Sequence, residues 1–97
     1  PITWTSRLKE LYGKPPYDPA AADGFDAPVL AKYNDIIRRL AKELGTGLVD
    51  VRAAFVAHTA KPDASFNDLL LDGMHPNDCG HALVAELLTP AIREQVR

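Results

Sequence analysis

The sequence has little of what marks several functional classes of protein. Its single cysteine, Cys79, cannot form an internal disulfide, so no oxidising compartment is implied. No apolar run approaches the roughly 20 residues that a membrane-spanning helix needs. The 11 basic and 13 acidic side chains leave a net charge of -2, which gives no electrostatic reason to expect nucleic acid or an anionic membrane surface as a partner.

Several catalytic and binding motifs are also missing. The sequence contains no phosphate-binding glycine loop, no cysteine pair and no basic stretch with interleaved aromatic residues, and we expect no cofactor. Ser6 and Ser65 are the only serines, and neither lies in a Gly-x-Ser-x-Gly or Gly-Asp-Ser setting that would expose its hydroxyl. Cys79 is expected to be a buried structural thiol. The sequence therefore offers no clear nucleophile.

The remaining composition is that of an ordinary globular domain. Hydrophobic residues make up 46% and charged residues 25%, and the 97 residues allow at most one small domain, which we assign to 1–97. Apolar residues at helical spacing predict a helix over 27–44, with Gly45 as its stop signal. A strand is predicted at 47–51, and so short a connection from helix to strand favours a parallel α/β sheet. Further helices are predicted at 52–58 and at 77–88, the second with Asn77 as its N-cap.

The segment 13–28 is predicted to be a long loop. It contains four prolines and two glycines, a density that excludes a regular element. Loops of this length are either functional or mobile. The segment is therefore either a linker or one wall of a pocket, in which case Tyr17 and Phe25 would contact the substrate.

The residues that suggest chemistry are Asp72 and His75, which flank Gly73 in a loop ahead of the last helix. A carboxylate that accepts a hydrogen bond from imidazole Nδ1 fixes the tautomer and leaves Nε2 free to take a proton. Pro76 restricts the backbone of His75 to extended or turn conformations. The pair is a candidate general base with its orienting acid.

Two other interpretations of this loop stay open. Asp-Gly is a common turn sequence, so Asp72 and His75 could do no more than shape a loop. A metal site would use Asp72, His75 and His81. The two histidines are six residues apart, however, and not the four that place both on one helical face.

The run Asp72-Gly-Met-His75-Pro-Asn-x-x-Gly80-His81, followed by a helix rich in alanine and leucine, resembles the last motif block of the SGNH (GDSL-type) serine hydrolases. The upstream order agrees: an Ile-Thr strand end, a variable loop, a helix around Tyr33, then the predicted strand and a short helix. The similarity spans most of the chain.

This resemblance implies a three-layer α/β/α, flavodoxin-like fold and a Ser-His-Asp triad that hydrolyses carboxylic esters. His75 corresponds to the general base of the family and Asp72 to its orienting acid. The Gly-Asp-Ser block of the family and the Gly and Asn of its oxyanion hole have no counterpart here. We therefore expect the C-terminal portion of such a hydrolase, inactive alone, with an ester as substrate and the N-terminal, serine-bearing part of the enzyme as partner.

An alternative hypothesis is a non-catalytic α/β binding or interaction domain in which Asp72 and His75 only shape a turn. Self-association stays open under both hypotheses, because two strand segments cannot bury the apolar faces of the predicted helices. A cytoplasmic location is favoured. A secreted parent also stays open, because the chain begins at Pro1 without an initiator methionine.

Overall fold

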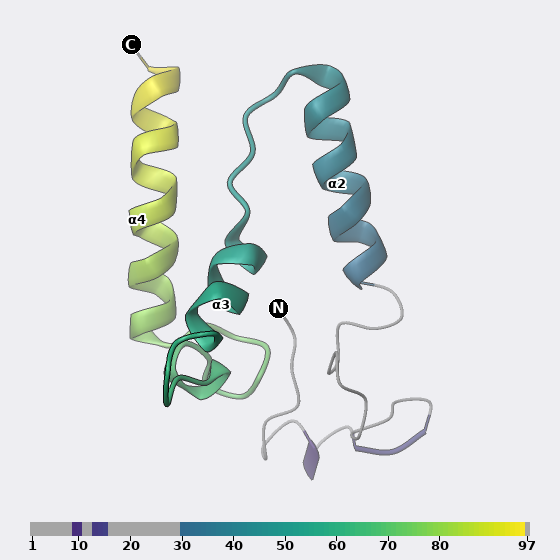
Figure 1. Ribbon diagram of the computed structural model, residues 1–97, viewed down its shortest axis with the longest axis vertical. Coiled ribbons are helices and arrows are strands. Elements are labelled where there is room, and N and C mark those ends of the chain that lie inside the picture. The colour runs from purple at the N-terminus through teal and green to yellow at the C-terminus, as the bar shows by residue number, and fades with distance from the viewer. Residues whose placement is uncertain (1–8, 11–12, 16–29, 97) are drawn as a thin grey trace.

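The computed structural model describes residues 9–10, 13–15 and 30–96 (Figure 1). From residue 30 onward the chain forms three α-helices and one 3-10 helix joined by irregular segments. They are α2 (Leu30–Leu44), α3 (Val51–Thr59), η1 (Phe66–Asp68) and α4 (Asp78–Gln95). In Figure 1, α2 and α4 run side by side with the irregular segment 46–50 between them, while α3, η1 and the turn before α4 gather below.

The helix α2 confirms the predicted helix over its described part, since residues 27–29 lie outside the described residues. Its apolar residues recur at helical spacing, and Gly45 follows at φ 65, a left-handed conformation that glycine adopts without strain. No residue of α2 is buried. The apolar stripe of this helix is therefore left uncovered by the other described residues.

The helix α4 is longer than the predicted 77–88. It begins after Asn77, as expected, but continues to Gln95 with Pro90 inside it. Proline removes one backbone hydrogen bond to the preceding turn, yet the helix continues for five residues beyond it. Of the helices in the described part, none is both long and apolar enough to cross a membrane.

The helix α3 begins at a polar cap that also ties it to α2. Asp50 accepts a hydrogen bond from the Ala53 N–H at 2.9 Å, which satisfies one of the free donors of the first turn. Arg38 of α2 donates to both oxygens of the same carboxylate, at 2.5 and 3.1 Å. The Arg38 guanidinium and then the Ala53 N–H lower the pKa of Asp50 to about 2.

Replacing Asp50 by alanine is expected to destabilise the protein at pH 7 by about 1 kcal/mol, the usual cost of a lost N-cap. The pKa of Asp50 is lower in the folded protein, so the contribution of Asp50 to stability is present above pH 4 and is lost as the pH falls toward 2. Urea unfolding of the unsubstituted protein and of Asp50→Ala should show that their difference in free energy of unfolding shrinks as the pH falls from 7 to 2. The exposed Asp35, which accepts a hydrogen bond from Arg38 Nη1 at 3.0 Å, provides the control Asp35→Ala, expected to have a much smaller effect. A constant difference down to pH 2 would contradict this account.

The predicted α/β fold class with its parallel sheet is wrong for the part of the chain that the structure describes. Residues 46–50 form no strand, and among the described residues the sole β-type pairing is an isolated antiparallel bridge between Leu70 and Pro76. The Val51 N–H donates to the Val49 carbonyl at 3.1 Å, so the segment ends in a tight turn centred on Asp50. Valine and leucine supply strand propensity, but a strand also needs a neighbour, and no described segment provides one.

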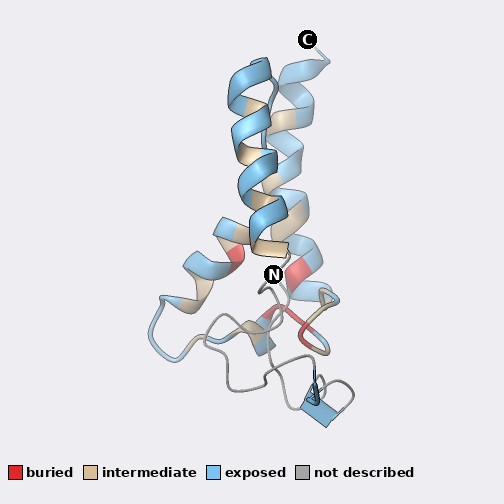
Figure 2. Cartoon of the chain, turned by 90° about the vertical axis from the view of Figure 1, so that its right-hand side faces the viewer, coloured by how far each residue is buried: buried red, intermediate tan, exposed pale blue. Residues whose placement is uncertain are grey.

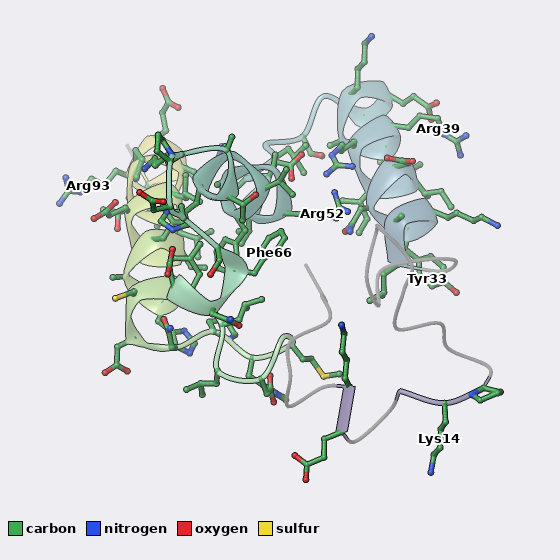
Figure 3. The ribbon with its side chains drawn as sticks, turned by 60° about the horizontal axis from the view of Figure 1, so that its bottom comes forward. Lys14, Tyr33, Arg39, Arg52, Phe66 and Arg93 are labelled. Atoms are coloured by element: carbon green, nitrogen blue, oxygen red, sulfur yellow. The ribbon has the colours of Figure 1, made fainter. Side chains whose placement is uncertain are left out.

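The core lies where α3, η1 and the start of α4 meet (Figure 2). Phe55, Leu69 and Leu70 are buried. Four partly buried side chains pack against them: Val51, Phe66, Leu83 and Val84. In Figure 3 the side chain of Phe66 projects from η1 toward α3, while Tyr33 lies apart on α2. The best-packed part of the described chain thus adjoins the loop that carries Asp72 and His75, because buried Leu69 and Leu70 lead into that loop.

Candidate active site

The loop that carries Asp72 and His75 is closed by a short antiparallel hairpin. The Leu71 N–H donates to the His75 carbonyl at 2.8 Å, and the Asn77 N–H donates to the Leu69 carbonyl at 2.9 Å. These two bonds flank the bridge between Leu70 and Pro76, which is a position that needs no N–H from either residue. Proline fits there without losing a hydrogen bond, and buried Leu70 fixes the hairpin to the core.

The Asp72 carboxylate performs two tasks with its two oxygens. Oδ1 accepts from the backbone N–H groups of Met74 and His75, both at 2.8 Å, and so closes the turn. Oδ2 lies 2.8 Å from Nδ1 of the His75 ring. Gly73 takes φ 98, a conformation that side chains rarely adopt. The turn alone would require only Oδ1, so the contact of Oδ2 with the ring is an additional feature.

The ionised Asp72 carboxylate determines which nitrogen of the neutral His75 ring carries the proton. Hydrogen bonds from the His75 backbone, the His75 ring and the Met74 backbone hold the pKa of Asp72 well below its usual value. An ionised carboxylate can only accept, so Nδ1 carries a proton and Nε2 keeps its lone pair when the ring is neutral. The His75 side chain is 67% exposed and that of Asp72 is 28% exposed. Nε2 is thus available to a reactant while the acid behind it is partly covered.

Asn77 connects the hairpin to both neighbouring elements. Its Oδ1 accepts from the Gly80 N–H at 2.9 Å and caps α4, as predicted. Its Nδ2 donates to the Asp68 carbonyl at 3.0 Å. A Cβ at Gly80 would lie 2.2 Å from the Leu69 carbonyl oxygen, so α4 approaches the hairpin as closely as a residue without a side chain allows.

Replacing Gly80 by alanine is therefore expected to destabilise the protein by about 1–3 kcal/mol, because the new methyl group meets fixed backbone atoms and must displace α4. The better helix propensity of alanine offsets only about 1 kcal/mol of the strain. Thermal unfolding should show the loss. Gly47→Ala is the matched control, since a Cβ there would meet only a Gln95 side-chain atom at 3.9 Å. Equal stability of the two variants would show that the close approach is not required.

Of the predicted site residues, the structure brings Asp72 and His75 together. Tyr17 and Phe25 fall outside the described residues. In the part of the chain that is described, no three His, Cys, Asp or Glu side chains form a cluster that could hold a metal. Cys79 is exposed, so the expectation of a buried thiol is wrong. It lies in the first turn of α4, where the core side contains Gly80.

The described part of the chain does not supply a nucleophile to His75. The Ser65 hydroxyl accepts from the Asn67 N–H at 3.2 Å and belongs to the cap of η1. Ser6 lies outside the described residues. No hydroxyl of a described residue forms a hydrogen bond with the His75 ring. The described residues therefore place a carboxylate against an imidazole ring, with no described hydroxyl bonded to that ring.

Sequence reasoning assigned no role to His58, because no acidic residue lies near it in the chain. In the structure its Nε2 lies 2.9 Å from Oδ2 of Asp68, ten residues later. The polar turn between α3 and η1 brings the two together, and Asp63 adopts φ 59 within it. The sequence predicts a helix at 52–58, but it does not predict how α3 packs on η1.

An open groove of about 520 Å³ lies far from His75. It is formed by residues 45–49 and the distal half of α4, including Leu88 and Ile92. Leu88 is ten residues beyond the first residue of α4, roughly 15 Å along the helix at 1.5 Å per residue, whereas His75 precedes that helix. The groove is therefore not part of the site around His75.

Comparison with known proteins supports the resemblance drawn from the motif. The model of the GDSL-like lipase/acylhydrolase family matches residues 6–83, which include Asp72, His75 and Gly80. No curated protein and no solved structure gives a match to this chain. The predicted family is confirmed.

Proposed function

Since the chain belongs to the GDSL-like lipase/acylhydrolase family, we propose that it supplies the general base and the orienting acid of an enzyme that cleaves carboxylic esters. His75 is the base and Asp72 the acid. The observation that carries the proposal is the contact of 2.8 Å between Asp72 Oδ2 and His75 Nδ1. A simple turn does not need this contact, and it leaves Nε2 as the proton acceptor.

In this mechanism a serine oxygen attacks the carbonyl carbon of the ester while Nε2 of His75 takes the hydroxyl proton. The tetrahedral intermediate collapses, the bond to the alcohol oxygen breaks, and His75 returns the proton to the leaving alcohol. Water then attacks the acyl-enzyme with the same assistance, which releases the carboxylic acid and restores the serine. Asp72 stabilises the imidazolium formed in each step.

The serine of this proposal comes from polypeptide other than these 97 residues. The Ser65 hydroxyl is engaged in a cap, and the sequence around Ser6 has no strand-to-helix glycine turn. The apolar surface is a second reason to expect a partner segment. Ile37 is 53% exposed, Leu44 71% and Ile92 56% on helices that flank the irregular segment 46–50. A segment that covers these side chains and brings a serine to His75 would meet both needs, and residues 1–97 alone would be inactive.

Labelling with a fluorophosphonate tests the proposal, because this reagent reacts with activated serines and the modified peptide can be identified by mass spectrometry. We expect the protein that contains these residues to hydrolyse a p-nitrophenyl ester and to carry the label on a serine other than Ser6 and Ser65. Label on either of these serines would place the nucleophile within this chain. Absence of both turnover and label would favour the alternative, a non-catalytic binding domain in which the loop is only a turn.

A further inference from the structure

The described part of the chain contains a second histidine–carboxylate pair that the proposed mechanism does not use. His58 Nε2 lies 2.9 Å from Asp68 Oδ2, nearly the same distance as in the Asp72–His75 pair. The environments differ. The His58 side chain is 23% exposed and that of His75 is 67% exposed. His58 is held in the contact between α3 and η1 and is less accessible than His75 to a substrate in solution.

Asp68 links this pair to the hairpin. Its Oδ2 also accepts from the Ser65 N–H at 2.9 Å, which completes the capping box of η1. These two bonds hold the pKa of Asp68 below its usual value, so the carboxylate remains an acceptor at neutral pH. The carbonyl of Asp68 accepts from Asn77 Nδ2 at 3.0 Å. One residue thus contacts α3 with its side chain and the start of α4 with its backbone.

Leu69, the residue after Asp68, extends this connection to His75. The Leu69 carbonyl accepts from the Asn77 N–H, and the Leu71 N–H donates to the His75 carbonyl. The backbone of His75 is therefore held by a hairpin arm that begins at η1. If η1 rotates or slides on α3, this arm moves with it, and His75 shifts relative to its surroundings.

Apolar packing by itself does not fix the position of η1 on α3. Phe66 of η1 packs against the buried cluster that contains Phe55 of α3. Hydrophobic burial is non-directional, so it allows small rotations of η1 at little cost in free energy. A hydrogen bond to a carboxylate is short and directional and selects one of these rotations. The His58–Asp68 bond, which joins α3 to η1, has that property.

We propose that His58 and Asp68 form a positioning pair, which fixes η1 on α3 and thereby holds the hairpin so that His75 keeps its place and its hydrogen bond to Asp72. In its catalytic aspect this inference rests on the proposed function. Its structural aspect can be tested without turnover, because the tautomer of the His75 ring reports the same geometry.

The test compares His58→Leu, which removes the donor, with His58→Gln, whose amide nitrogen can occupy the place of Nε2. Ser65→Ala is the control, because it removes the other half of the η1 capping box and leaves His58 and Asp68 intact. We expect His58→Leu to lower kcat about tenfold with KM changed less than twofold, because displacement of a catalytic group affects the transition state more than binding. His58→Gln should restore most of kcat, and Ser65→Ala should retain it.

Nitrogen NMR of histidine-labelled protein supplies the second measurement. The unsubstituted protein should show His75 in one tautomer, protonated at Nδ1, and His58→Leu should show a mixture of tautomers. If the parent hydrolyses no ester, the proposed function fails and this spectrum alone decides the present inference. Unchanged kcat and an unchanged His75 spectrum in His58→Leu would overturn it, as would equal losses in His58→Leu and His58→Gln. Should His58→Leu not fold, Asp68→Ala compared with Ser65→Ala gives the same decision.

Discussion

Replacing His75 by alanine is expected to lower kcat for ester hydrolysis about 10⁴-fold or more, because the serine then has no base to take its proton. KM should change little, since the ring is not required to hold the substrate. The side chain is 67% exposed and its ring contact is with Asp72, so the protein should fold normally. The measurement is steady-state hydrolysis of a p-nitrophenyl ester, with circular dichroism to verify the fold.

His81 provides the matched control for this substitution. It is the other histidine near the start of α4, and its side chain is exposed. His81→Ala should retain kcat within about twofold, as is usual for surface substitutions away from a site. Loss of activity in both variants would indicate that the start of α4, and not the His75 ring, is what matters. Full activity in His75→Ala would remove the proposed mechanism.

Replacing Asp72 by asparagine is expected to lower kcat about 10³- to 10⁴-fold while the turn is kept. The reason lies in the two oxygens of Asp72. The N–H groups of Met74 and His75 both need an acceptor at the position of Oδ1, so the amide oxygen of asparagine must occupy it. The amide NH₂ then faces Nδ1 of His75. Because NH₂ can only donate, Nδ1 becomes an acceptor and the ring proton moves to Nε2, which can no longer act as a base.

This substitution separates the two interpretations of the loop. If Asp72 only shapes a turn, asparagine should serve as well as aspartate, and ester turnover should be unchanged. If Asp72 orients the base, nitrogen NMR should show the proton transferred from Nδ1 to Nε2 as kcat falls. Asp78→Asn, the same chemical change at an exposed position in the first turn of α4, is the control and should leave both measurements unaltered.

The contact between Asp72 and His75 was more predictable from sequence than the fold around it. The geometry of Asp72 and His75 depends on hydrogen bonds within four residues, so their spacing, Gly73 and the cap at Asn77 were sufficient to predict it. The helix α2 was predicted over its described length for the same reason, since periodicity and the stop at Gly45 are local. Tyr17 and Phe25 lie outside the described residues and stay predictions.

The strand predicted at 47–51 shows where local reasoning failed. Val49 and its neighbours have strand propensity, yet a strand exists only when another segment accepts its hydrogen bonds, and the described chain offers none. The same segment instead ends at Asp50, which caps α3 and binds Arg38 from α2. The partner of a segment is a property of the whole fold, so no window of sequence could supply it.

The amino-acid sequence by itself thus determined the family and the hydrogen-bonded turn that joins Asp72 to His75, because both depend on residues a few positions apart. Only the tertiary structure showed which residues pack against that turn. It packed the hairpin against Phe55 through Leu70, brought His58 to Asp68 across ten residues, and left the apolar face of α2 uncovered by the other described residues. These contacts join segments distant in sequence, and they form or fail according to how whole elements pack.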